Sequence, residues 1–139
     1  PEGTLLIALY GKGTVSKTAR LGIDAATNQA IAGILPKGDD AFDPKYLQNY
    51  LIHSRNTLLN VTVNPSSDTG RTNIYLGALR SFKIALPPIE EQKKIAKRLS
   101  AVDEKISKEK EKKQALKDLK RGLMQDLLTG KVRTSPASN

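Results

Sequence analysis

The chain has 139 residues, enough for one modest domain and an appendage. It contains no cysteine, which excludes disulfides, thiolate zinc sites and cysteine nucleophiles and suits a cytoplasmic protein. No run approaches the roughly 18 apolar residues of a membrane span, so we expect no membrane partner. The net charge of +9 favours a polyanionic partner, with nucleic acid first.

Several short strands are expected in the first two thirds of the chain. Residues 4–10 form an apolar run between two glycines, which is typical of a buried strand. Residues 11–28 are rich in Gly, Thr and Ala and predict a loop with room for a short strand. A further strand is expected at residues 29–35, and two short ones at 73–76 and 81–86, the last from its alternating apolar positions.

One helix is expected among these strands. Asp43 and Pro44 form a helix start, with the aspartate as N-cap and the proline at the first helical position. Apolar residues then recur at helical spacing to about residue 60. His53, the single histidine, lies on this helix with no carboxylate cluster nearby. We expect no catalytic residue, no metal site and no cofactor.

Residues 11–18 follow the first strand and nearly match the phosphate-binding loop of nucleotide hydrolases. The second glycine that such a loop needs is replaced by Ser16. We therefore interpret the segment as a loop whose Lys12, Lys17 and Arg20 meet the phosphates of a DNA duplex. A small nucleotide-binding enzyme is the weaker alternative.

Polar side chains that can contact base edges lie in two further loops. Arginine and asparagine can make paired hydrogen bonds to guanine or adenine in the major groove. Ordinary loop polarity explains the same residues without DNA, so these positions are a hypothesis. The candidate DNA-binding residues of both kinds are Lys12, Lys17, Arg20, Asn28, Arg71, Asn73 and Tyr75.

Residues 87–130 are predicted to form one long helix. A double proline and two glutamates mark its start, and glutamates favour the positive end of the helix dipole. Gly130 marks its end. About forty residues at about 1.5 Å each span roughly 60 Å. The preceding domain is expected to be about half as wide, so the helix needs a partner along its length.

An apolar seam with alternating steps of three and four runs along this helix, the spacing of a coiled coil. The almost wholly charged residues 107–114 interrupt it. We expect two copies to bury their seams antiparallel as a homodimer, with a two-fold symmetry that suits a bipartite DNA site. The predicted interface residues are Ile95, Leu99, Val102, Ile106, Leu116, Leu119, Leu123 and Leu127.

Two strings bound the long helix: LPPIEEQKKI at residues 86–95 and GLMQDLLTGKVR at residues 122–133. Together with the upstream segments 6–11 and 24–30, they resemble the DNA-specificity subunit of type I restriction–modification enzymes. The resemblance covers about residues 3–133, and the two ends of the helix are its most specific part.

This resemblance implies a full subunit with two target recognition domains, each followed by a long helix. The two helices pair antiparallel, set the spacing between two half-sites and dock methyltransferase subunits, which recruit the restriction subunit. Adenine methylation, ATP-driven translocation and cleavage belong to those other subunits. Because this chain has one recognition domain and one helix, we expect the C-terminal half of a full subunit or a half-sized subunit that dimerises.

The expected fold is α+β. A small mixed-sheet target recognition domain with a helix, N-terminally incomplete, occupies residues 1–86, a coiled-coil-forming spacer helix residues 87–130 and a tail residues 131–139. The expected function is non-catalytic recognition of one half of a bipartite double-stranded DNA site. The alternative is a coiled-coil protein-interaction scaffold without specific DNA binding.

Overall fold

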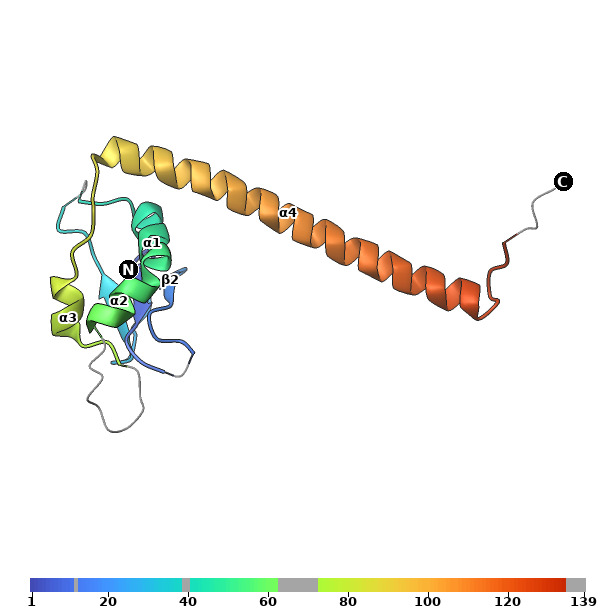
Figure 1. Cartoon of the computed structure of the whole chain (residues 1–139), viewed down its shortest axis with the longest axis horizontal. Helices are drawn as coiled ribbons and strands as arrows, with labels where there is room; N and C mark the ends of the chain where they lie inside the picture. The colour runs from blue at the N-terminus through green and yellow to red at the C-terminus, as the bar shows by residue number, and fades with distance from the viewer. Residues whose placement is uncertain (12, 39–40, 63–72, 135–139) are drawn as a thin grey trace. The chain divides into compact units, whose positions relative to one another are not determined.

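The structure is a computed structural model that describes residues 1–11, 13–38, 41–62 and 73–134. It divides into two compact units, Pro1–Lys97 and Arg98–Asn139. The first unit holds a sheet and short helices, and the 40-residue helix α4 (Ile89–Leu128) begins in it and continues through the second (Figure 1). The expected α+β class and the long C-terminal helix are confirmed.

Three short strands form the sheet: β1 (Leu5–Ala8), β2 (Thr18–Arg20) and β3 (Ile31–Ile34). Their order is β2-β1-β3, and β1 is antiparallel to both neighbours. We expected a mixed sheet, but the pairing in the described residues is antiparallel throughout. Parallel neighbours need a crossover connection, usually a helix, and only loops link these three strands.

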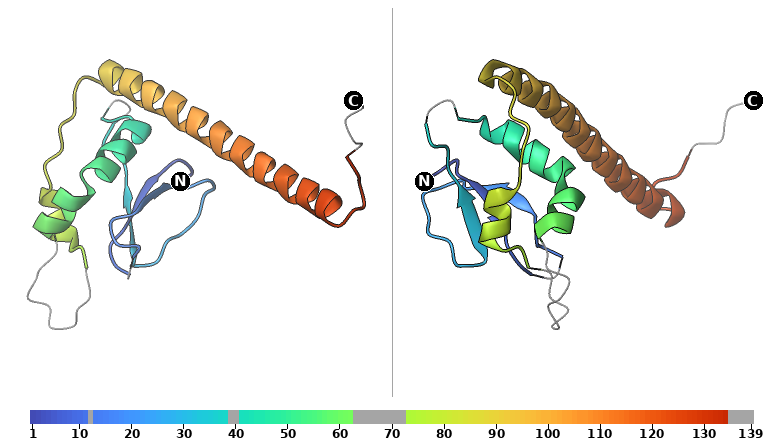
Figure 2. Two further views of the ribbon diagram at one scale, coloured as in Figure 1. Left: turned by 45° about the vertical axis from the view of Figure 1, so that its right-hand side comes forward. Right: turned by 60° about the vertical axis from the view of Figure 1, so that its left-hand side comes forward.

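The core of the first unit lies between this sheet and two helices, α1 (Pro44–His53) and α2 (Arg55–Thr62), which Figure 2 shows on one side of the strands. Alternate residues of β1 and its extension face this core, as the two-residue period of a strand requires. The buried cluster consists of Leu5, Ile7, Leu9, Val15, Leu47, Leu51, Leu58 and Ile74.

The start of α1 is the one predicted from the sequence. The Asp43 carboxylate accepts a hydrogen bond from the Tyr46 N–H at 2.8 Å, and Pro44 takes the first turn. We expected one helix to about residue 60, but the backbone leaves helical geometry at Ser54, where ψ is 11°. The chain continues as α2, so the apolar period belongs to two helices.

The segment after residue 72 differs from the two strands predicted there. Asn73 makes a single bridge with Tyr10, and the short helix α3 (Leu76–Ser81) follows. The strand predicted at 81–86 is wrong. Phe82 and Ile84 do pack against the core, but the extended segment that carries them pairs with no strand among the described residues.

A buried glutamine holds the first turns of α4 to the first unit. Gln92 is 2% exposed. Its Oε1 accepts a hydrogen bond from the Asp43 N–H at 2.9 Å, and its Nε2 donates to the Pro87 carbonyl at 2.8 Å. The N-cap of α1 is therefore tied to the residues that lead into α4. Ala96, one turn later, is also buried.

Tyr46 strengthens the same junction. Its hydroxyl donates to the Ala85 carbonyl at 2.9 Å, and its ring lies 6.3 Å from that of Tyr50. Burial raises the pKa of Tyr46, with smaller contributions from Tyr50 and Glu91. The hydroxyl therefore keeps the proton that it donates.

The end of α4 is also the predicted one. Gly130 has a φ of 73°, the left-handed conformation that glycine adopts without cost after a helix. The Thr129 hydroxyl donates to the Gln125 carbonyl, and Lys131 pairs with Asp126 at 3.3 Å. The Thr129 bond satisfies a backbone carbonyl near the end of the helix, and the ion pair adds a contact between side chains.

We predict that Gln92→Ala lowers the free energy of unfolding of the first unit by about 2–3 kcal/mol, because it leaves the Asp43 N–H and the Pro87 carbonyl without partners. Urea denaturation followed by far-ultraviolet circular dichroism measures this. Gln125→Ala, on the exposed side of the same helix, is the matched control, expected within about 0.5 kcal/mol. Equal effects of the two substitutions would contradict the bridging role.

Candidate nucleic-acid interface

The C-terminal end of β1 is the point where distant segments of the first unit meet. Leu9 donates its N–H to the Ala30 carbonyl at 2.8 Å and accepts from the Ile74 N–H at 2.7 Å. The next residue, Tyr10, pairs with Asn73. Because the N–H and C=O of one strand residue point to the same edge, Ile74 extends the β3 side of β1.

On the other edge of β1, the hairpin after residue 10 ends in a β-bulge. Ser16 donates its N–H to the Ala8 carbonyl at 2.8 Å, and Ala8 donates to the Lys17 carbonyl at 2.9 Å, so two residues oppose one. Ser16 has a φ of 64°, the left-handed conformation of the first bulge position. Gly11 has a φ of 115°, and a Cβ there would collide with the Thr14 hydroxyl.

This hairpin contradicts the interpretation of residues 11–18 as a nucleotide-binding loop. Such a loop wraps phosphates at the N-terminus of a helix that follows it. Here the segment leads into β2, an antiparallel neighbour of β1. The alternative of a nucleotide-binding enzyme built on this segment is therefore wrong.

Arg55, at the start of α2, fixes the conformation of the hairpin. Its Nε donates to the Ser16 Oγ at 2.8 Å, and its Nη2 donates to the Val15 carbonyl at 3.3 Å. Ser16 is 3% exposed, so its hydroxyl needs a partner inside the protein. The guanidinium thus holds in place the two residues that precede Lys17.

The predicted DNA-binding residues fall into three groups. Four are brought to the end of β1: Lys17, Asn28, Asn73 and Tyr75. Arg20 instead pairs with Leu5 at the opposite end of the β1–β2 ladder. Lys12 and Arg71 lie outside the described residues. Direct contact of these side chains with DNA remains a prediction.

Asn73, Tyr75 and Tyr10 present polar and aromatic groups at this strand end. Ile74 is buried, so in the extended backbone the side chains of its two neighbours point away from the core. Tyr75 is 53% exposed and Tyr10 is 37% exposed. The sequence-based prediction omitted Tyr10, although an aromatic residue that closes an apolar run just before a glycine is a usable signal.

Asn28 has a structural role at the same end. Its Oδ1 accepts from the Ala30 N–H at 2.9 Å, and its backbone carbonyl accepts from the Ile31 N–H at 3.1 Å. This is an asparagine turn that leads into β3. The turn accounts for Asn28 without a ligand, whereas no comparable contact among the described residues accounts for the Tyr75 side chain.

Within the described residues, no group of three or more His, Cys, Asp or Glu side chains is placed to hold a metal ion. His53 is exposed at the end of α1. The described helices also include none whose length and apolar content would let it cross a membrane.

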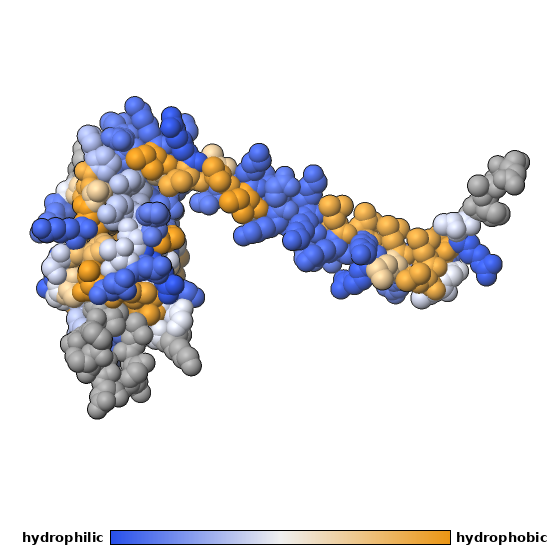
Figure 3. All heavy atoms as spheres, in the orientation of Figure 1, coloured by the Kyte–Doolittle hydropathy of each residue, from blue (hydrophilic) through white to orange (hydrophobic). Residues whose placement is uncertain are grey.

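The predicted seam of α4 is accessible to a partner. Ile95 is half-buried, and the other seven predicted interface residues are between 42% and 58% exposed. Figure 3 shows two apolar stretches on the helix with a charged stretch between them. Exposed apolar stretches of this kind are typical of surfaces that bind a partner.

Comparison with known proteins decides the family. Residues 1–118 match the type I restriction modification DNA specificity domain, and this range includes the strand end, the hairpin and most of α4. The chain belongs to this family. The family resemblance is thereby confirmed, and the matched range includes the string at residues 86–95 but ends before the string at residues 122–133.

Two proteins of Methanocaldococcus jannaschii are similar to parts of this chain. One, whose name assigns it as the specificity subunit of the type I restriction enzyme MjaX, is 51% identical over 55 residues. The other, the specificity subunit of the type I restriction enzyme MjaVIII, is 38% identical over 65 residues. The aligned segments cover 40% and 47% of this chain but only 13% and 15% of these relatives.

We predict that Arg55→Ala lowers the free energy of unfolding by about 1–2 kcal/mol, because the buried Ser16 hydroxyl and the Val15 carbonyl lose their donor. Amide hydrogen exchange at Ser16 should accelerate more than exchange in β3. Arg80→Ala, which removes an exposed guanidinium from α3, is the control and should change neither quantity. Uniform acceleration over the whole sheet would contradict a local role for Arg55.

Proposed function

We propose that this chain is the part of a type I specificity subunit that recognises one half of a bipartite double-stranded DNA site. The observation that carries the proposal is the meeting of Lys17, Asn73, Tyr75 and Tyr10 at one strand end. These residues come from separate segments of a domain that belongs to a DNA specificity family.

The chemistry of these side chains suits a duplex. Lys17 is exposed and can neutralise a phosphate, which positions the protein without reading sequence. An asparagine amide can hydrogen-bond the N6 and N7 edge of adenine. The exposed tyrosines add donors and apolar surface beside it. Arg20, Lys12, Arg71 and Asn28 stay in the proposed set of DNA contacts.

We further propose that α4 acts as a spacer and docking element. In a half-sized subunit it pairs with a second copy, and the two-fold symmetry of the pair matches the two halves of the site. The helix and its surroundings dock methyltransferase subunits, and through them the restriction subunit. Methylation, translocation and cleavage then belong to those subunits, and the chain acts without catalysis or cofactor in the cytoplasm.

The competing function is a coiled-coil scaffold that binds only protein. The exposed apolar seam favours it, because a lysine-rich helix with such a seam can serve protein association alone. The two functions differ in their response to salt and to DNA sequence. A specific reader shows a steep salt dependence and prefers one family of duplexes, whereas a scaffold shows neither.

We predict that Lys17→Ala weakens duplex binding and lowers the salt slope, in log affinity against log salt, by about 1, the effect of losing one phosphate contact. Fluorescence anisotropy with a randomised duplex pool, measured at several salt concentrations, gives the slope. Arg20→Ala makes the same charge change at the other end of the β1–β2 ladder and should have a smaller effect. A larger loss of duplex affinity for Arg20→Ala than for Lys17→Ala would place the DNA interface at the other end of β2. If the unsubstituted chain binds no duplex, the scaffold function is favoured.

A further inference from the structure

Tyr10 and Asn73 face each other across the bridge at the end of β1. Their neighbours Leu9 and Ile74 form the backbone hydrogen bond beside this bridge, at 2.7 Å, so Tyr10 and Asn73 are a non-hydrogen-bonded antiparallel pair. Side chains come closest to each other in such a pair, with Cβ atoms about 4.5–5.5 Å apart. The phenol ring and the amide therefore lie side by side.

Both side chains lie on the face of the strands that points away from the core. Leu9 and Ile74 are buried in the core, and residues along an extended strand alternate between its two faces. Tyr10 is 37% exposed and Asn73 is half-buried. Among the described residues, neither the Asn73 amide nor the Tyr10 hydroxyl has a hydrogen-bond partner. Their polar groups are therefore available to a ligand.

The backbone that carries this pair is held in place. The Thr14 hydroxyl donates to the Tyr10 carbonyl at 3.3 Å, and Gly11, with its φ of 115°, turns the chain directly after Tyr10. On the other strand, the Ile74 N–H is bonded to the Leu9 carbonyl. The two side chains thus start from fixed positions, which reduces the entropy lost when they bind a ligand.

We propose that Tyr10 is a specificity-determining residue that reads one A·T base pair together with Asn73 in the major groove. The Asn73 amide hydrogen-bonds the adenine, and the Tyr10 ring covers the methyl group of the thymine. This inference rests on the DNA recognition proposed above and assigns to it one base pair and two reading groups.

The Asn73 amide selects adenine by the order of its two polar groups. Adenine presents an N6 donor beside an N7 acceptor in the major groove, and an amide offers the matching acceptor and donor. Guanine presents acceptors at both O6 and N7, so the amide oxygen would meet another oxygen. The amide therefore distinguishes the two purines.

Tyr10 distinguishes the two pyrimidines. Thymine carries a C5-methyl group in the major groove that cytosine lacks, and an apolar surface can contact it. The Tyr10 ring provides that surface directly beside the amide. Tyr75 is more exposed, at 53%, but it precedes α3 and faces no strand residue in the described part of the chain. The strand pairing thus selects Tyr10 as the partner of Asn73.

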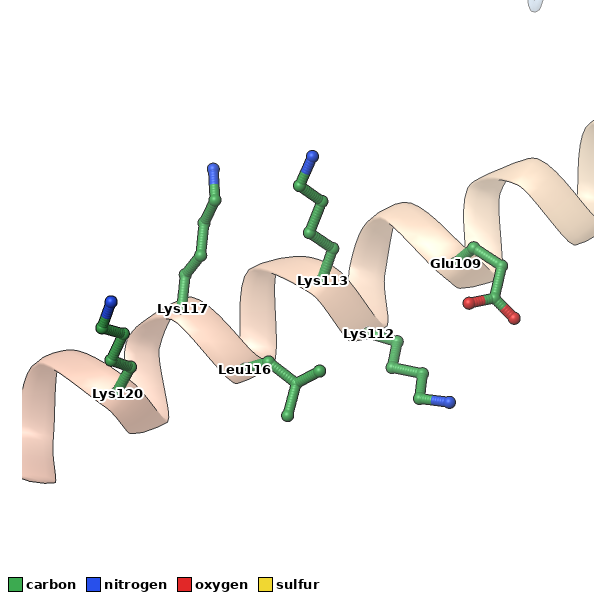
Figure 4. A pocket seen from close by; sticks show the side chains of 6 residues that line it. All are labelled: Glu109, Lys112, Lys113, Leu116, Lys117 and Lys120. Atoms are coloured by element: carbon green, nitrogen blue, oxygen red, sulfur yellow. The ribbon is translucent and has the colours of Figure 1, made fainter.

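The exposed lysines of α4 offer a contrast. Figure 4 shows Lys113, Lys117 and Lys120 extending from one side of the helix. Flexible point charges of this kind can neutralise phosphates, but such contacts carry no sequence information. Base discrimination needs an acceptor, a donor and an apolar group in fixed positions, and the Tyr10–Asn73 pair combines all three.

Methylome sequencing of cells that carry the intact restriction system locates the base pair. Tyr10→Ala and Asn73→Ala should each relax the same A·T position in one half of the methylated motif. Asn56→Ala, which removes an exposed amide from α2, is the matched control and should leave the motif unchanged. Tyr10→Phe should also leave it unchanged, because the ring and not the hydroxyl meets the methyl group.

Base analogues test the two contacts separately in the purified methyltransferase complex that contains the intact subunit. Uracil in place of the thymine removes only the methyl group and should weaken duplex binding about fourfold. Replacing the adenine by 7-deazaadenine removes the N7 acceptor and should weaken binding about tenfold. Uracil should have no further effect in Tyr10→Ala, nor 7-deazaadenine in Asn73→Ala, because each contact is then already lost.

The other outcomes are distinct. Relaxation of two different positions by the two substitutions, or an unchanged motif for both, overturns reading by this pair and leaves DNA recognition by other residues standing. A complex that prefers no duplex over any other overturns the proposed DNA recognition itself. If a substituted subunit fails to fold, the unsubstituted complex decides. The inference is then overturned if no A·T pair of the half-site is sensitive to both analogues.

Discussion

Gln92 joins three parts of the first unit through one side-chain amide. Its oxygen holds the backbone of Asp43, whose own carboxylate caps α1, and its nitrogen holds the carbonyl of Pro87. Both bonds are shielded from water, where an unpaired amide or carbonyl is costly. The start of α1 and the start of α4 are therefore set by the same group. The core helices and the long helix depend on each other at their N-terminal ends.

The end of β1 is held by backbone hydrogen bonds on both of its edges. The backbone of residues 8–10 bonds to the hairpin on one edge and to residues 30 and 74 on the other. These bonds join backbone groups, so the exposed side chain of Tyr10 can differ without loss of the fold, whereas Ala8 and Leu9 are buried. The left-handed Ser16 and its Arg55 donor hold the hairpin in place.

Local signals in the sequence were sufficient for the start of α1 and for both ends of α4. Asp43 with Pro44 predicted the start of α1, and the double proline with Gly130 predicted α4, because caps and breakers act within a few residues. Contacts that join distant segments were not predictable in this way. Nothing in the sequence around Arg55 indicates Ser16 as its acceptor, and the alternation at Phe82 and Ile84 predicted a strand although it reflects only an extended segment over the core.

Only part of the candidate site was predictable from the sequence, because strand pairing joins segments that are distant in the chain. Residue type alone selected Lys17, Asn73 and Tyr75, and the strand pairing of β1 is what brings them together. Residue type also selected Arg20, which pairing places at the other end of the ladder, and Asn28, which a turn explains. In α4, the three-four spacing predicted the apolar seam, and most of its side chains are exposed in the structure.

Methylome sequencing of cells that carry the intact restriction system tests the central claim most directly. Replacing Tyr10, Asn73 and Tyr75 together should change the bases of one half of the methylated bipartite motif and leave the other half and the spacing between them intact. An unchanged motif at normal methylation levels would contradict DNA reading at the end of β1.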